Sequence, residues 1–291
     1  MTQFGRLAAA PANPEIALED PLMLKRKQSQ RLKAHLLTAT IIALINGGSL
    51  SAQTREPAAG LLWRQCSEDV LALSLAPAAI AAVVGSEVTL RLNDGQARVS
   101  IFVQDCSSNR IDGREYGPSQ DVHIWALIEA SADTRPVVGA AQTMPTLSWL
   151  NLYSGMTNPQ LREAFAAAGR HYDSINNLSL YSLQEGKEGH VDVTPDLRFS
   201  WTYEPVGRVE LPMGVNHDIY HRTDDGKFAL TVIQAVANMS AFNAPGTLTV
   251  VGGTDPQKVV ASGTYPIAVA AISMVARGSL YGPNGTGTIP R

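Results

Sequence analysis

Apolar and polar residues alternate along most of the chain beyond residue 85, and this period of two is typical of β-strands with one buried face. Residues 86–106, SEVTLRLNDGQARVSIFVQDC, alternate on both sides of Asn93-Asp94-Gly95, which predicts a β-hairpin. Its apolar positions are Val88, Leu90 and Leu92 on the first arm and Val99, Ile101 and Val103 on the second. Residues 121–130, DVHIWALIEA, predict a further strand, and the polar residues 107–120 predict a long loop before it.

Two short segments carry helical signals instead. In residues 74–85, SLAPAAIAAVVG, Pro77 suits the first turn of a helix and Gly85 suits its end. In residues 158–172, NPQLREAFAAAGRHY, Asn158 can cap a helix whose apolar stripe includes Leu161 and Phe165. We therefore expect two short helices in an otherwise β-rich chain.

Short strands and turns return after the second helix. Residues 175–212 alternate around the turn sequences EGKEG and TPD, and residues 245–256 contain the strand-like GTLTV. The apolar residues 259–283 fit either a buried pair of strands or a short helix, because periodicity alone does not separate the two. The pattern predicts a mainly β (α+β) fold with a few short helices.

The N-terminal part has the composition of a secretory signal peptide. A basic block, LKRKQSQRLK, precedes an apolar run of about 10 to 12 residues and small residues that suit cleavage after Ala52. That run is shorter than the roughly 20 residues of a membrane-spanning helix, so we expect no stable membrane anchor after cleavage. Met23, just ahead of the basic block, is an alternative translation start. We expect an exported protein, periplasmic or extracellular, with an N-terminal extension and signal peptide over residues 1–52, a linker over 53–65, one β-rich domain over 66–282 and a flexible tail over 283–291.

Removing residues 1–52 changes the charge balance. It takes away six basic and three acidic residues, so 17 basic and 23 acidic residues remain and the formal charge becomes −6. The remaining chain has no basic patch of the kind that tracks phosphates, which argues against nucleic acid as a partner. Cys66 and Cys106 both remain, and in an oxidising compartment they either form a disulfide or stay as two buried thiols.

The order of these features resembles that of the acetoacetate decarboxylase-like superfamily. The resemblance rests on LAPAAIAAVVGSEVTLRLNDGQARVSIFVQDCS, on DVHIWALIE, and on the later GTLTV and TDPQKVVAS. It covers most of residues 66–282 and implies a closed or partly closed antiparallel β-barrel. Decarboxylases of the family use a lysine as Schiff-base nucleophile, with a second lysine beside it. At that place this chain has AAQTMPTLSWLNL, without lysine, and Lys187, Lys227 and Lys258 lie in turn-like sequences, so we expect no Schiff-base chemistry.

The pentapeptide HDIYH, residues 217–221, is the sharpest local candidate for chemistry. His217 and His221 share one face of a helix, as in zinc proteases, but they also share one face of a strand, with Asp218 on the other. The β-rich surroundings favour a strand. Zinc would need a third ligand, for which the candidates are His123, His190, Asp192 and Asp218. We expect no cofactor, with zinc as the alternative.

Acid–base chemistry without a metal is the broader alternative. His123 lies two residues from Asp121 and six from Glu129, so a regular strand places all three on one face. A histidine that only packs against Trp125 at the rim of the barrel is the other explanation. Four aromatic residues suit the lining of an apolar pocket, although core packing explains them equally well: Trp149, Tyr153, Trp201 and Tyr203.

We therefore predict an exported enzyme that acts on a small oxygenated, partly apolar carbonyl or carboxylate compound inside the barrel. The reaction would be of lyase, isomerase or hydrolase type, with His123, His217, His221 and Asp218 as the catalytic candidates. The alternative is a non-catalytic periplasmic protein that binds a small molecule. The identity of the ligand and the oligomeric state do not follow from the sequence.

The position of the cleavage site is directly testable. N-terminal sequencing of the exported protein should begin at Gln53, because the small residues up to Ala52 follow an apolar run of signal-peptide length. An exported protein that retains residues 1–22 or Met23 would contradict this prediction.

Overall fold

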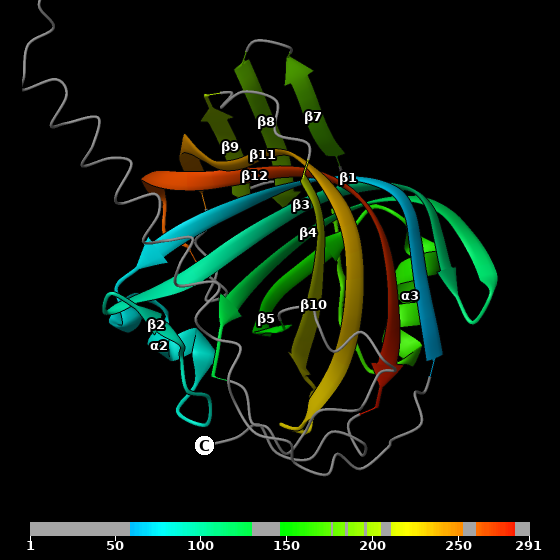
Figure 1. Ribbon diagram of the computed structural model, residues 1–291. Coiled ribbons are helices and arrows are strands. Elements are labelled where there is room, and N and C mark those ends of the chain that lie inside the picture. Colours follow the sequence, from blue (N-terminus) through cyan, green and yellow to red (C-terminus); the bar gives the residue numbers. More distant parts are fainter. Residues whose placement is uncertain are drawn as a thin grey trace, which may run out of the picture. The chain divides into compact units, whose positions relative to one another are not determined.

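The backbone is dominated by strands that pair in chain order around a closed ring, as a computed structural model shows (Figure 1). The model describes residues 59–129, 146–175, 177–183, 186–194, 197–204, 211–252 and 260–282. The predicted signal peptide and tail, residues 1–52 and 283–291, lie outside these ranges. The elements in chain order are β1 (Ala59–Leu75), α2 (Pro77–Val84), β2 (Leu92–Asn93), β3 (Gln96–Ile111), β4 (Arg114–Leu127), β5 (Thr146–Met156), α3 (Pro159–Ala167), β6 (Asp173–Ser174), β7 (Asn177–Leu183), β8 (Gly186–Thr194), β9 (Leu197–Tyr203), β10 (Leu211–Arg222), β11 (Phe228–Gly252) and β12 (Gly263–Tyr281).

Seven strands form the barrel, in the order β10-β5-β4-β3-β1-β12-β11, and pairing of β11 with β10 closes it. All neighbours in the ring are antiparallel except β5 and β10, which run parallel. The predicted mainly β fold with a closed barrel and few short helices is confirmed.

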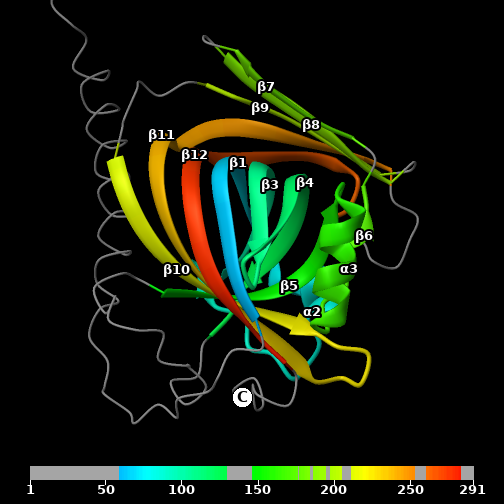
Figure 2. The ribbon, with the colours of Figure 1, turned by 90° about the vertical axis from the view of Figure 1, so that its right-hand side faces the viewer.

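Strand β11 belongs to the barrel and to a second sheet. It has 25 residues, of which 228–239 pair with β10 and 246–252 pair with β9. Strands β9, β8 and β7 continue from there and lie on the outer side of the barrel (Figures 1 and 2). The apolar residues 259–283, for which the sequence left two possibilities, contain the single long strand β12.

The inner face of the barrel is identified by aromatic and imidazole side chains that come from separate strands and lie close together. The centroids of the Phe102 and His217 rings are 6.3 Å apart, although β4 and β5 lie between their strands. Three strand spacings in a flat sheet would separate the backbones by about 14 Å, so these side chains converge on a concave face. Trp125 and Trp149 complete this inner aromatic group.

The outer face of these strands is also apolar and buried where other elements cover it. Leu71, Val99 and Val122 pack in one apolar cluster with Ile80 of α2 and Trp201 of β9. Helix α2 and the second sheet therefore cover this part of the barrel wall, which explains why both faces of β3 and β4 carry apolar residues.

Both predicted helices are present. Helix α2 starts with Pro77 and ends at Gly85, whose φ of 79° requires glycine. In α3 the Asn158 side chain accepts a hydrogen bond from the Leu161 amide at 3.0 Å. Leu161 and Phe165 join the cluster of inward-facing residues, so α3 covers the interior of the barrel near the end at which β1 begins (Figure 1).

Three sequence expectations need correction. Residues 107–120 are not a loop, because β3 continues to Ile111 and β4 starts at Arg114 around an Asp112-Gly113 turn with φ angles of 49° and 78°. This is the same Asp-Gly hairpin signal as at Asp94-Gly95. The first arm of that earlier hairpin is short: only Leu92 and Asn93 pair with β3, and Leu92 is exposed. The linker expected over 53–65 is strand from Ala59 onward.

Among the described residues, none of the helices has the length and apolar character needed to cross a membrane. This finding concerns helices alone.

A disulfide joins the first two long strands. Cys66 on β1 and Cys106 on β3 lie directly opposite each other, and their sulfur atoms are bonded. Of the two possibilities that the sequence left open, the structure has the bonded pair.

Reduction of this bond should lower the free energy of unfolding by roughly 3 to 4 kcal/mol, because the bond closes a loop of about 40 residues in the unfolded chain. Urea unfolding with and without reductant measures the difference. A Cys66→Ala, Cys106→Ala variant serves as control and should not respond to reductant. An unchanged midpoint in a wild-type protein with two titratable thiols would contradict the prediction.

Candidate functional site

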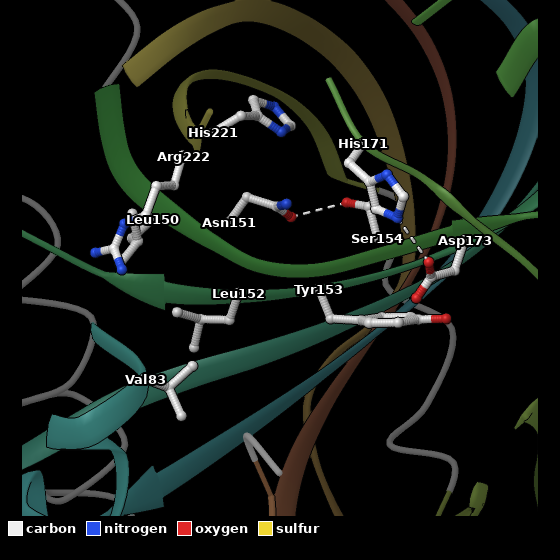
Figure 3. A pocket seen from close by; sticks show the side chains of 10 residues that line it. All are labelled: Val83, Leu150, Asn151, Leu152, Tyr153, Ser154, His171, Asp173, His221 and Arg222. Carbon is white, nitrogen blue, oxygen red and sulfur yellow. Dashed lines mark hydrogen bonds and ion pairs between the residues drawn. The ribbon is translucent and has the colours of Figure 1, made fainter. Parts of the chain in front are cut away.

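The barrel wall has an opening along one edge of β5. This edge pairs with β10 over Thr146–Leu150 and with β6 at Gly155 and Met156. Residues 151–154 lie between these pairings and have no strand partner on that edge among the described strands. A cavity of about 220 Å³, here called the side cavity, opens at this place (Figure 3).

The side cavity joins buried and exposed groups. Asn151, Ser154 and His221 line it from the inner face, and the Ser154 and His221 residues are only 4% and 3% exposed. His171 and Asp173 line it on the solvent side, and their side chains are hydrogen-bonded at 2.8 Å. A small molecule that enters here would therefore pass exposed groups and meet buried polar ones.

Ser154 anchors a chain of hydrogen bonds that fixes the protonation of His123. The Trp125 indole N–H donates to Asn151 Oδ1 at 3.1 Å, and the Ser154 hydroxyl donates to the same oxygen at 2.8 Å. Because the single hydroxyl proton of Ser154 is used, its oxygen accepts from His123 Nδ1 at 3.0 Å. His123 thus carries its proton on Nδ1 and keeps a lone pair on Nε2. Burial lowers the pKa of His123 to about 3, so the ring is neutral.

Tyr172 lies between His123 and His221. Its ring centroid is 5.8 Å from that of His123 and 6.4 Å from that of His221. Its side chain is hydrogen-bonded to Ser154, and burial raises the pKa of the phenol, which therefore stays protonated. The sequence analysis did not single out Tyr172. The only signal for it is its position directly after the second predicted helix.

His217 and His221 do not come together as a pair. They lie on β10, as predicted for a strand, and four residues along a strand separate backbones by about 13 Å. His217 Nδ1 accepts a hydrogen bond from the Trp149 indole at 2.9 Å, and His221 Nε2 lies 3.2 Å from Thr231 Oγ1. One ion between these two rings is therefore not feasible. Across the described ranges, no cluster of three or more histidine, cysteine or acidic residues is arranged to hold a metal ion.

Four of the eight predicted catalytic and ligand-binding residues face the barrel interior: His123, His217, His221 and Trp149. Asp218 lies on the opposite face of β10, because side chains alternate along a strand. Tyr153 lines the side cavity, and its ring belongs to the outer apolar cluster.

Trp201 and Tyr203 belong to β9, outside the barrel. The Trp201 indole donates to Asp69 Oδ2 at 3.0 Å, and both rings pack in the outer cluster. Their expected place in the barrel pocket is therefore corrected: these aromatics hold the second sheet against the barrel.

A row of three polar residues crosses the inner face beside the histidines. Glu68 on β1, Gln104 on β3 and Asp121 on β4 occupy directly opposite positions. Burial, with a smaller effect of Asp69, raises the pKa of Glu68 to about 8. Burial raises the pKa of Asp121 to about 7 against a 2.5 Å hydrogen bond from Ser119. Glu129, the other acidic candidate beside His123 in the sequence, lies exposed two residues beyond the end of β4.

The lysine side chain that the structure describes is exposed and is not buried in the barrel. Lys227 is exposed in the turn between β10 and β11 and pairs with Asp225 at 2.7 Å. Lys187 is the second residue of β8, in the second sheet, and Lys258 lies outside the described residues.

Comparison with known proteins supports the fold. No protein-family model and no curated protein matches the chain. Among solved structures, the acetoacetate decarboxylase of Legionella pneumophila subsp. pneumophila is similar, with a TM-score of 0.50 at 10% identity over 81% of this chain and 91% of that one. A second acetoacetate decarboxylase has a TM-score of 0.49 at 10% identity, covering 78% and 88%. The enduracididine biosynthesis enzyme MppR has 0.47 at 10% identity, covering 81% and 96%.

At such low identity the likeness concerns the fold alone. The expected resemblance to acetoacetate decarboxylase-like proteins is confirmed at the level of the barrel. The chemistry of the site has to be argued from the residues of this chain.

The buried Glu68 carboxyl makes stability depend on pH. Its pKa rises from 4.5 in the unfolded chain to about 8 in the folded protein, so its contribution to stability is complete below pH 4.5 and is lost as pH rises to 8. A Glu68→Gln variant lacks this loss. Its free energy of unfolding relative to wild type should therefore increase between pH 4.5 and pH 8, by on the order of 4 kcal/mol.

Chemical denaturation of both proteins at the two pH values measures this difference. The exposed Glu129→Gln is the control and should change the free energy of unfolding by less than about 0.5 kcal/mol at either pH. A Glu68→Gln variant whose difference from wild type is the same at both pH values would refute the assignment of a buried, protonated Glu68.

Proposed function

We propose that the protein is an enzyme that carries out acid–base chemistry on a small, partly apolar carbonyl or carboxylate compound, without a Schiff-base lysine. The observation that carries this proposal is the cluster of His123, Tyr172 and His221 around Ser154. Two members of the cluster, Ser154 and His221, line the side cavity, and His123 and Tyr172 lie directly behind them. Neutral imidazole with a free nitrogen and a protonated phenol are the groups that general base and general acid catalysis need.

The reaction class that suits these groups is proton transfer next to a carbonyl. His123 Nε2 would take the proton from the carbon beside the carbonyl, and the electron pair of the broken C–H bond would move to the carbonyl oxygen. The Tyr172 hydroxyl, which donates to Ser154 in the free protein, would turn its proton to that oxygen and donate a hydrogen bond to it. Return of the proton to another carbon gives isomerase chemistry, and loss of a neighbouring group gives lyase chemistry.

The low pKa of His123 fits this role once a substrate is bound. Burial alone depresses it, so the free enzyme holds an unprotonated ring at neutral pH. A negative charge on the substrate or on its enolate favours the imidazolium and raises that pKa when the proton is transferred.

Export is a further part of the proposal. The disulfide between Cys66 and Cys106 is typical of an oxidising compartment and agrees with the signal-peptide composition of residues 24–52.

Deuterium exchange tests the chemistry without knowledge of the natural substrate. In D₂O, the protein should accelerate exchange of the C3 protons of 2-oxobutanoate or the C–H protons of butanone, followed by NMR. His123→Gln should reduce the acceleration by roughly 100-fold or more, because general base catalysis contributes 10²–10⁴. His190→Gln, on the second sheet, is the matched control and should keep the wild-type rate.

Borohydride added with 2-oxobutanoate should leave no adduct on the protein, since no imine forms. Equal exchange by wild type and His123→Gln would refute the assigned base. Saturable binding of the probes with no exchange would favour the alternative, a non-catalytic binding protein.

A further inference from the structure

We propose that Arg170, Thr231 and His221 form a hydrogen-bonded relay that binds an anionic oxygen of the ligand, a carboxylate or an enolate, in the side cavity. This inference deepens the proposed function, because it rests on the same cavity and names the charge that its ligand carries. The relay starts at a buried guanidinium and ends at an imidazole N–H without a protein partner.

Arg170 brings a positive charge into the barrel. The residue is 1% exposed and follows α3 in the connection to β6. Its guanidinium donates to the main-chain oxygens of Ala168, Leu230 and Tyr281 at 2.5, 2.6 and 3.1 Å. Within the part of the chain that the structure describes, no carboxylate forms an ion pair with it. Burial lowers its pKa only to about 10, so the charge persists at neutral pH.

The Thr231 hydroxyl links the Arg170 guanidinium to the His221 ring by hydrogen bonds. Arg170 Nε donates to Thr231 Oγ1 at 2.8 Å, and the same oxygen lies 3.2 Å from His221 Nε2. Because Oγ1 accepts from the guanidinium and no other acceptor for its proton lies among the described residues, the Thr231 hydroxyl donates to His221 Nε2. The proton of the neutral His221 ring is therefore on Nδ1.

His221 Nδ1 is the open end of the relay. This atom is buried and has no hydrogen-bond partner, while the His221 side chain lines the side cavity. A buried N–H without a partner is destabilising, so nitrogens of this kind are normally satisfied by a protein group, a water or a ligand. Figure 3 shows His221 on the same side of the cavity as Asn151 and Ser154.

The charge balance selects the ligand class. The described groups that line the inner side of the cavity, Asn151, Ser154 and His221, are neutral, and the cation linked to them is Arg170. The charged groups elsewhere in the lining already have partners: Arg222 is paired with Glu87, and Asp173 is hydrogen-bonded to His171. A hydrogen bond from Nδ1 becomes stronger when its acceptor is ionised. An anionic oxygen at Nδ1 would also offset the buried guanidinium, whereas a neutral carbonyl compound would not.

The experiment compares 2-oxobutanoate with its methyl ester on the full-length secreted protein. Long-range ¹H–¹⁵N spectra of the histidine rings should show His221 as the Nδ1–H tautomer in the free protein, and 2-oxobutanoate should shift its resonances. The methyl ester should bind at least ten-fold more weakly.

Thr231→Val removes the relay and nearly keeps the shape of the side chain. It should weaken binding of 2-oxobutanoate ten-fold or more and leave binding of the ester unchanged, because a hydrogen bond to an ionised acceptor is stronger than one to a neutral acceptor. Thr249→Val, on the part of β11 in the second sheet, is the matched control and should bind like wild type.

Several results would overturn the inference: an Nε2–H tautomer for His221 in the free protein, equal affinity for the acid and the ester, or equal effects of the two threonine variants. The first two concern the wild-type protein, so they decide the matter even where Thr231→Val does not fold.

A second inward-facing arginine offers an internal comparison. Arg98 shares the face of Phe102 on β3, pairs with Ser74 near the opposite end of β1, and has a buried Nε without a partner. Arg98→Gln should leave binding of 2-oxobutanoate unchanged. Loss of binding in this variant alone would place the anion at the other end of the barrel and refute the relay.

Failure of the two proposals can be told apart. If 2-oxobutanoate binds and shifts the His221 resonances but no deuterium exchange occurs, the proposed catalytic function is wrong and the proposed anion site stands. If deuterium exchange occurs but the acid and the ester bind with equal affinity, only the proposed anion site is wrong.

Discussion

A short parallel pairing between β5 and β10 is the constraint on which the site depends. Only five residue pairs, from Asn216 with Thr146 to Tyr220 with Leu150, join these strands and complete the ring. Beyond them β10 turns into its hairpin with β11, and the two-residue β6 takes the next place beside β5. The barrel is thus continuous enough to bury the side chains of its inner face, yet open at the point where Ser154 and His221 lie.

The interior is polar but carries few charges. His123 and His217 are held neutral by burial, and Glu68 is held protonated at neutral pH for the same reason. Charged forms of these groups would each face a large desolvation cost in the barrel. Arg170 is different, because a guanidinium keeps its proton and is stabilised by main-chain oxygens instead. The site therefore combines neutral donors and acceptors with a buried guanidinium, a composition quite unlike a lysine pair.

The sequence predicted what local patterns determine. Alternation placed His217 and His221 on one strand face, Pro77 and Asn158 marked the helix starts, and the Asp94-Gly95 turn was evident. The equivalent turn at Asp112-Gly113 was missed because polar neighbours concealed the alternation. Tyr172, Arg170 and Thr231 were not predicted, since they meet only when the connection after α3 reaches β11, about 60 residues later in the chain. Trp201 and Tyr203 were misplaced because aromatic composition does not distinguish the inner sheet face from the outer one.

The contacts of Arg170 affect how the chain can vary. Three of the four groups that hold its guanidinium are peptide carbonyls, which every amino acid at positions 168, 230 and 281 supplies. Substitutions at those positions that preserve the backbone would leave the cation in place, whereas changes at Arg170, Thr231 or His221 alter the relay itself. Related proteins with this anion site would therefore share these three side chains, while the residue types at positions 168, 230 and 281 would vary. This pattern of conservation could be read from their sequences without any measurement of activity.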